Sequence, residues 1–480
     1  MTFLSSKRAR IATKTRKGLF LLSSRTLITN ILQIISSLVL AKLLIPYDYS
    51  IFGILNNWIN SLSYFSDVGL HESLIQQKES ISKKHIQNYL GLRLTLSMIL
   101  SVLFALLILF FKDYLEIKEN NLLFYFLGFL TFFDVLSSVP KIFLQKDLDF
   151  SRLAKLETIA TTCLYFGQIL FASLGFSYWC FFIGVFLRTF IVISFGIKNK
   201  MFSFPSFKVF KNLKGYLQKG IFFQLNLIIV AIHTILTPLV LKSFLPLQEI
   251  GLIYWVTGLV SIPTSFINNF HQTLFPAIAK LQSEEEEIII LMARANNIIL
   301  FLTFFIFGLG TNSGGAILLN IFDKKWHAGV SILPFIAISI GLYNLRTIPN
   351  VILAGVGTPQ KRTHVELGNT LLFLISTFYF GNKFGLNGYL WSLTITSIFS
   401  MIFSYIKIFR YLTSETIRRF FIFLIASAVS IYGTFYFGLH KSILNSSIFF
   451  ICGFTFISTL FDKKIIFEVR DILIKLPNKR

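Results

Sequence analysis

Acidic residues and cysteines are scarce in this chain. Its 480 residues include 22 Asp and Glu against 45 Lys and Arg; only 14% of residues are charged, whereas 54% are hydrophobic. This balance excludes a basic soluble domain and a nucleic-acid-binding protein. The three cysteines, Cys163, Cys180 and Cys452, all fall within apolar segments. The sequence therefore predicts neither a disulfide framework nor a metal site.

Motifs of catalysis are missing as well. The chain has no Gly-rich phosphate-binding loop with a lysine, no cluster of metal ligands and no nucleophile elbow. The largest expected outer loop, near 311–328, is about 18 residues long and too short to house a catalytic domain. We therefore expect a protein that is not an enzyme, holds no cofactor and does not hydrolyse nucleotides for energy.

Long apolar segments, in contrast, occupy most of the chain. A bilayer core of roughly 30 Å is crossed by a helix of about 20 apolar residues. Continuous runs such as 96–111 do not alternate as barrel strands do. The sequence predicts an all-α polytopic membrane protein with about 14 transmembrane helices. We expect them at 19–43, 49–70, 88–111, 121–140, 154–174, 176–197, 216–240, 248–275, 288–310, 329–356, 364–384, 386–406, 417–437 and 444–461.

The basic residues orient these spans. With a cytoplasmic N-terminus, about 32 of the 45 Lys and Arg fall in loops on the inner side. The outer loops hold only Lys112, Lys118, Lys242, Lys324, Lys325, Lys383 and Lys441. Because positive charge gathers on the cytoplasmic side, both termini are predicted to be cytoplasmic.

The longest basic connection divides six spans from eight. We expect a basic cytoplasmic N-terminus, two lobes joined by a basic inner linker, a pair of extra spans and a basic tail. In residue numbers these are 1–18, 19–197 (spans 1–6), 198–215, 216–410 (spans 7–12), 411–461 (spans 13 and 14) and 462–480. Prolines at corresponding places, Pro46 and Pro246, then Pro140 and Pro349, fit parallel six-helix repeats.

Lys155, Lys219, Lys383, Arg418 and Arg419 lie in the end turns of predicted spans and are counted with the loops. The basic residues assigned to the spans themselves are then Arg25, Lys42, Arg93, Arg188, Arg294 and Arg346. A central arginine costs about 2.5–3.5 kcal/mol on insertion scales and usually faces a polar cavity or a partner. Lys42 lies at the outer end of its span. Arg93 and Arg294 are shallow enough to snorkel to the inner headgroups.

Arg188 and Arg346 lie deeper, roughly 13–15 Å from the inner boundary at about 1.5 Å of rise per residue. We expect both to line a cavity, joined by Arg25, whose span has a polar face. The alternative is a structural ion pair. Guanidinium offers bidentate donors that match phosphate oxygens. The sequence thus favours an anionic lipid headgroup, such as a pyrophosphate, bound by these three arginines.

Four acidic residues lie within or near predicted spans, namely Asp67, Asp134, Glu157 and Glu366, and the first two are candidates for ion coupling. Asp67, in span 49–70, lies at a depth where it can pair with Arg25. Asp134, in span 121–140, is better placed to bind a coupling proton or cation. For each, the alternative is a local ion pair or a helix-end contact.

Residues 24–76 resemble the start of bacterial polysaccharide-biosynthesis flippases, the Wzx-like relatives of multidrug exporters of the MATE type. The matching segments are 40–49 (LAKLLIPYDY), 52–53 (FG) and 65–70 (FSDVGL), followed by 145–154 (QKDLDFSRLA) and 175–179 (GFSYW). Spans grouped as six, six and two match the architecture of that family. The resemblance therefore covers essentially the whole chain, although its motifs say little about the sugar.

The resemblance implies two six-helix bundles around a central cavity that opens alternately to each side of a bacterial cytoplasmic (inner) membrane. The implied cargo is a polyprenyl-pyrophosphate-linked oligosaccharide repeat unit for a surface polysaccharide (O-antigen, capsule or exopolysaccharide). A polysaccharide polymerase and a chain-length regulator are the implied partners, and H⁺ or Na⁺ the implied coupling ion. The assignment of Arg25, Arg188 and Arg346 to the pyrophosphate rests on their depth and not on a family motif.

Three other functions stay open. The main alternative is a MATE-like small-molecule antiporter, although intramembrane arginines argue against a cationic drug. A membrane-embedded polymerase would carry a large outer loop that this chain lacks. A peptidoglycan-precursor flippase has a chemically similar cargo headgroup.

Overall fold

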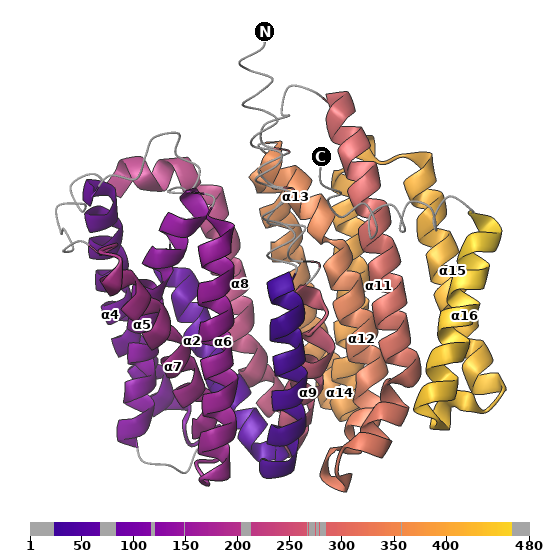
Figure 1. Ribbon diagram of the computed structural model, residues 1–480, viewed down its shortest axis with the longest axis horizontal. Helices are drawn as coiled ribbons and strands as arrows, with labels where there is room; N and C mark the ends of the chain where they lie inside the picture. Colours follow the sequence, from indigo (N-terminus) through magenta and orange to yellow (C-terminus); the bar gives the residue numbers. More distant parts are fainter. Residues whose placement is uncertain are drawn as a thin grey trace. The chain divides into compact units, whose positions relative to one another are not determined.

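The computed structural model describes residues 24–67, 83–116, 121–147, 149–202, 213–265, 285–356 and 358–462, with Ile267, Leu274 and Ile278 (Figure 1). Most of these residues are helical, and none of them lies in a strand. The predicted all-α polytopic fold is confirmed. Such a fold suits a lipid environment because each helix satisfies its own backbone hydrogen bonds.

The chain divides into two compact units, one ending at Gly251 and the other beginning at Leu252. The first contains the helix Ser24–Leu43, α2 (Pro46–Asp67), α4 (Lys83–Phe111), α5 (Asn121–Lys146), α6 (Phe150–Ser173), α7 (Trp179–Lys198) and α8 (Leu213–Lys242). The boundary lies within α9 (Leu247–Ser261). The second contains α11 (Glu285–Ile321), α12 (Gly329–Leu345), α13 (Thr347–Gly355), α14 (Pro359–Lys407), α15 (Ser414–Tyr436) and α16 (Ile443–Phe461). The predicted domain limits stay predictions.

Ten of the described helices are long and apolar enough to cross a membrane. Helices α2, α6 and α9 are not among them, although each overlaps a predicted span, and α12 and α13 are counted together as Gly329–Leu353. Helix α14 counts once but contains the two predicted spans 364–384 and 386–406. A described helix therefore overlaps every span that the apolar runs predict.

Gly385 divides α14 into an antiparallel hairpin. Its φ of 57° and ψ of −131° are non-helical, a conformation open to glycine because it has no Cβ. A Cβ on Gly368 would lie 3.7 Å from the ring of Phe399, whereas 31 residues of straight helix would separate them by about 46 Å. The turn lies where the sequence separates the two spans.

Prolines shift three predicted boundaries. Helix α5 continues past Pro140 to Lys146 instead of ending at 140, since prolines are tolerated in membrane helices. Within the predicted span 329–356 the helical hydrogen bonding is interrupted at Arg346, between α12 and α13, because Pro349 has no N–H to donate to the carbonyl of Leu345. Helix α9 ends at Ser261, shortly before Pro263, within the predicted span 248–275.

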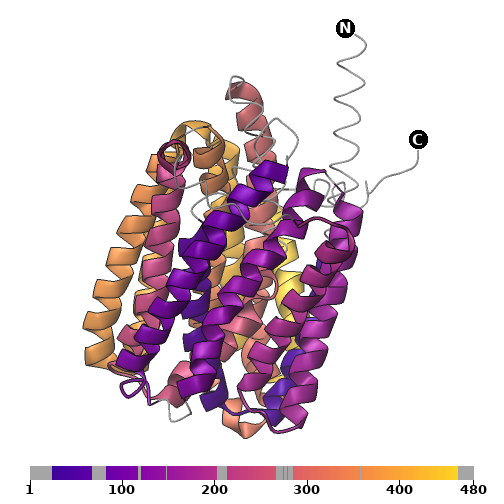
Figure 2. The same ribbon diagram turned by 90° about the vertical axis from the view of Figure 1, so that its left-hand side faces the viewer.

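In the first unit, α4 packs on α5, α6 on α7 and α5 on α7, and Figure 2 shows these helices running alongside one another. Arg93 of α4 is buried, with 4% of its surface exposed, and donates to the hydroxyls of Ser66 and Ser138, each at 3.4 Å. It does not snorkel to the headgroups, because neighbouring helices supply polar partners. Lys42 of the same unit is exposed, and so is Arg294, which lies on α11 of the second unit.

The family-like segments meet at one helix end. The Asp48 carboxylate accepts from the backbone N–H of Ile45 at 2.9 Å and from the hydroxyl of Ser177. Next to it, the ring of Phe52 stacks on Phe181 with centroids 4.2 Å apart. In another such segment, Asp149 accepts from the backbone N–H of Arg152 and caps α6. These segments thus build turns and helix ends.

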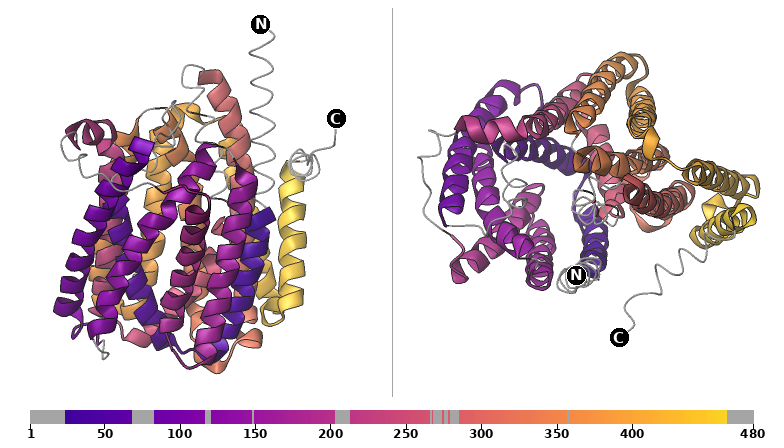
Figure 3. Two further views of the ribbon diagram at one scale, coloured as in Figure 1. Left: turned by 60° about the vertical axis from the view of Figure 1, so that its left-hand side comes forward. Right: turned by 90° about the horizontal axis from the view of Figure 1, so that it is seen from above.

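Helices α15 and α16 pack on each other and on α11, and lie side by side in Figure 3. Rings from all three helices form one cluster: Phe301, Phe305, Phe423, Phe450 and Phe454.

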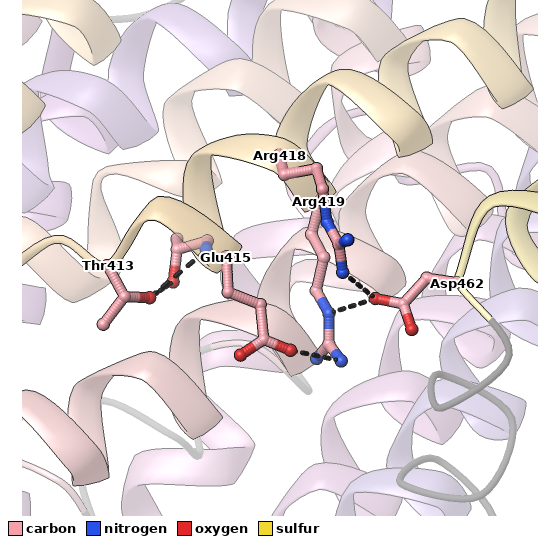
Figure 4. A network of polar contacts seen from close by, with 6 residues as sticks. Thr413, Glu415, Arg418, Arg419 and Asp462 are labelled. Carbon is pink, nitrogen blue, oxygen red and sulfur yellow. Dashed lines mark hydrogen bonds and ion pairs between the residues drawn. The ribbon is translucent and has the colours of Figure 1, made fainter.

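A charged network joins the ends of this pair (Figure 4). The side chain of Arg419 is 1% exposed; its Nε lies 2.9 Å from Asp462 Oδ2 and its Nη2 lies 2.9 Å from Glu415 Oε1. Arg418 Nη2 approaches the same Asp462 oxygen at 3.2 Å. Because buried charges require partners, this network links α15 to the residue that follows α16.

Candidate anion-binding site

The structure brings two of the three predicted arginines together. Arg25 lies in the first turn of the helix Ser24–Leu43, and Arg188 lies in the middle of α7. Both belong to the first unit, and the charge of Arg188 acts on Arg25. Arg346 lies in the second unit.

Arg25 forms an ion pair with Glu157 of α6. Each of the two side chains is 18% exposed, so the pair is only partly covered. The sequence suggested Asp67 as the partner of Arg25. Asp67 is the last residue of α2, and its side chain lies outside the described residues.

Arg188 has no such partner. Its half-buried guanidinium forms no ion pair or hydrogen bond with any residue that the structure describes. Its charge also acts on Tyr165 of α6 and on Lys141 of α5. An unpaired arginine at this depth needs a counter-charge or water, since ionised groups inside a membrane are costly.

Lys141 is a third cation at this place. It lies within α5 because the helix continues past Pro140, and the charges of Arg25, Arg188 and Asp134 all act on it. Its ammonium has no hydrogen bond or ion pair within the described part of the chain. We call Arg25, Lys141 and Arg188 the cationic cluster.

Asp134 lies on α5, half-buried and seven residues before Lys141. Its carboxylate is near enough to act on Lys141, yet forms no direct ion pair in the described residues. Asp134 therefore lies beside the cationic cluster. Its predicted part in ion coupling stays a prediction.

Arg346 caps the C-terminus of α12 and is 1% exposed. Its Nη2 pairs with Glu366 of α14, and the guanidinium lies over the ring of Tyr343 at 4.6 Å. Its Nε and Nη1 are buried without a hydrogen-bond partner. This is the ion-pair arrangement that the sequence analysis gave as the alternative. A role in binding pyrophosphate stays a prediction.

The cluster can hold an anion. Two guanidinium groups and an ammonium offer many N–H donors. Glu157 forms a direct ion pair with Arg25 alone among these three cations. Arginine binds phosphate oxygens bidentately, and lysine adds a point charge. No group of three or more His, Cys, Asp or Glu able to hold a metal ion occurs among the described residues.

The sequence does not place Lys141 at this site, and it marks Glu157 only as an acidic residue within a span, without naming Arg25 as its partner. The predicted span ends at Pro140, which places Lys141 in a loop. Its spacing of seven residues from Asp134, which puts both on one face of a continuous helix, was the available signal. Glu157 could not be matched to Arg25, since pairing between distant helices depends on their packing.

The chain was compared with known proteins. The sequence pattern of a family described as polysaccharide biosynthesis protein matches residues 39–331. A search of curated proteins found no match.

Three solved structures are similar in fold. The lipid II flippase MurJ, in an inward closed conformation, superposes with a TM-score of 0.72 at 16% identity over 93% of this chain and 100% of its own. An inward-facing multidrug resistance MATE transporter reaches 0.60 at 14% identity, over 82% and 98%. A MATE transporter of Vibrio cholerae reaches 0.52 at 13% identity, over 84% and 98%. At these identities the likeness concerns the fold alone. The chain thus belongs to the polysaccharide biosynthesis protein family and is a multi-pass membrane protein with the fold of MurJ and the MATE transporters.

Proposed function

We propose that this protein is a flippase that moves polyprenyl-pyrophosphate-linked oligosaccharide repeat units across the bacterial cytoplasmic membrane, by alternating access, for a surface polysaccharide. Membership of the polysaccharide biosynthesis family supports the pathway, and the fold supports a transporter. A polysaccharide polymerase and a chain-length regulator belong to the proposal as partners that use the product.

The observation that carries the proposal is the cationic cluster. Arg188 and Lys141 are cations without a direct counter-ion in the described chain, and they lie beside Arg25 in a membrane-spanning unit. Like charges gathered in a medium of low dielectric repel strongly unless an anion offsets them. A pyrophosphate supplies such an anion, whereas a cationic drug would be repelled. The cluster therefore favours the flippase over a MATE-like antiporter of cations.

Ion coupling forms a further part of the proposal. Asp134 lies next to Lys141, so a proton or sodium ion bound at Asp134 would change the charge balance of the cluster. Asp67 is kept as the second proposed carboxylate. Either ion, H⁺ or Na⁺, fits this role.

Lipid analysis of a strain that lacks this protein tests the function. We expect a complete polyprenyl-pyrophosphate repeat unit to accumulate on the cytoplasmic face, because synthesis continues while translocation stops. Plasmid-borne wild type should restore the surface polysaccharide. An unchanged lipid pool contradicts the proposal and favours the antiporter.

The Arg188→Ala variant tests the site within the same strain. We expect a loss of surface polysaccharide of at least about tenfold, because the site loses a bidentate donor and a positive charge, while the amount of protein in the membrane is unchanged. Arg294→Ala is the matched control, since Arg294 is exposed on α11. Full activity of Arg188→Ala removes the cationic cluster from the proposal.

A further inference from the structure

The cationic cluster contains its own anion. Glu157 reaches from α6 to Arg25 and forms the one direct ion pair that the cluster makes in the described part of the chain. Both side chains keep 18% exposure, so a ligand can reach the guanidinium without unpacking a helix. An arginine donor that points at a carboxylate oxygen can point equally well at a phosphate oxygen. The carboxylate of Glu157 and a phosphate of the ligand therefore compete for the same N–H donors of Arg25.

The net charge of the cluster depends on whether Glu157 is paired with Arg25. The groups that act on it are the cations Arg25, Lys141 and Arg188 and the carboxylates Asp134 and Glu157, so three positive charges face two negative ones. Without Glu157 the excess rises from one positive charge to two, because three then face Asp134 alone. Each phosphate of a pyrophosphate diester carries a negative charge. The cluster thus matches this headgroup only when Glu157 has left Arg25.

We propose that Glu157 is an internal competitor of the cargo headgroup. It occupies Arg25 while the site is empty, yields Arg25 to the pyrophosphate on loading, and pairs with Arg25 again when the headgroup leaves. Glu157 thereby lowers the affinity of the site and speeds release, which keeps a strongly cationic site from trapping its cargo. This inference rests on the proposed function.

A binding titration tests the competitor. The full-length protein in detergent is titrated calorimetrically with farnesyl pyrophosphate, and the same variants are assayed for surface polysaccharide in the deletion strain. Glu157→Gln keeps the shape of the side chain but removes its charge. We expect its affinity to rise about tenfold while polysaccharide output falls, since release is no longer assisted. Loss of a purely structural ion pair would not tighten binding.

A matched control and a second variant complete the design. Glu116→Gln removes a glutamate from another ion pair of the same unit, with Lys242 at 2.9 Å, and should change neither affinity nor output. If Glu157→Gln does not fold, Glu157→Asp replaces it: the shorter side chain holds Arg25 less well, so affinity should still rise.

Each result has one meaning. Unchanged or weaker binding by the folded Glu157 variant overturns the competitor, even if Arg188→Ala also weakens binding and so supports the pyrophosphate site. Absence of binding by the wild type overturns the pyrophosphate site itself, and the competitor with it. Tighter binding with undiminished output overturns the role in release.

Discussion

At the scale of single residues, intramembrane arginines in this chain fall into different classes. Arg93 is buried and donates to serine hydroxyls, and Arg346 is buried against Glu366. Arg188 is half-buried with no partner among the described residues. Arg188 and Arg346 lie at similar depths along their predicted spans, so the sequence does not distinguish them. Their packing does. A buried arginine with a carboxylate partner has a structural role available, whereas the half-buried Arg188 needs a counter-charge or water.

Removing the charge of Arg346 should therefore destabilise the protein. In Arg346→Met, Glu366 loses its counter-ion, and breaking a buried pair costs about 3–5 kcal/mol. We expect a clearly lower thermal unfolding midpoint of the purified protein in detergent. The double variant Arg346→Met/Glu366→Gln should recover most of the loss, because no unpaired charge is left. Wild-type stability of Arg346→Met combined with lost polysaccharide output would instead assign Arg346 to the cargo.

At the scale of elements, one proline and one glycine accompany breaks in helices, whereas other prolines lie inside them. Pro349 lies just after a break between α12 and α13, whereas Pro140 lies inside the continuous α5. Apolar runs therefore locate helices more reliably than their ends. The extension of α5 is what places Lys141 beside Arg188. An error of a few residues at a helix end thus concealed a member of the site.

The hairpin in α14 depends on Gly385. Alanine at φ 57°, ψ −131° is strained, at a cost of about 1–3 kcal/mol. We expect Gly385→Ala to lower the thermal unfolding midpoint and the yield of folded protein. Gly368→Ala in the same element is the control, because its Cβ would meet Phe399 at an ordinary 3.7 Å. Equal stability of the two variants would show that the turn does not require glycine.

At the scale of the whole molecule, the distribution of Lys and Arg predicts the topology. About 32 of the 45 basic residues fall on one side if successive loops alternate. The cationic cluster lies inside the helical part of the first unit; Arg25 and Arg188 fall outside this count, whereas Lys141 is counted with the loops although it belongs to α5. The loop charges are expected to orient the chain, whereas the cluster charges are proposed to bind the cargo headgroup.

Cysteine labelling in cells tests this topology. In a background with Cys163, Cys180 and Cys452 replaced by serine, Lys441→Cys should react with an impermeant thiol reagent added outside. Arg410→Cys should react only after the inner face is opened. Both positions are exposed, and α15 separates them, so a difference reports sidedness and not burial. The reverse labelling pattern would invert the predicted orientation.

The sequence by itself determined the helical class, the positions of the spans and the family resemblance. These follow from local rules, because every segment in a bilayer must be apolar and satisfy its own backbone. Only the tertiary structure decided that Glu157 pairs with Arg25, that Lys141 joins Arg188, and that Arg346 is held by Glu366. Such pairings depend on the rotation and register of helices that are distant in sequence, and residue types alone do not specify either.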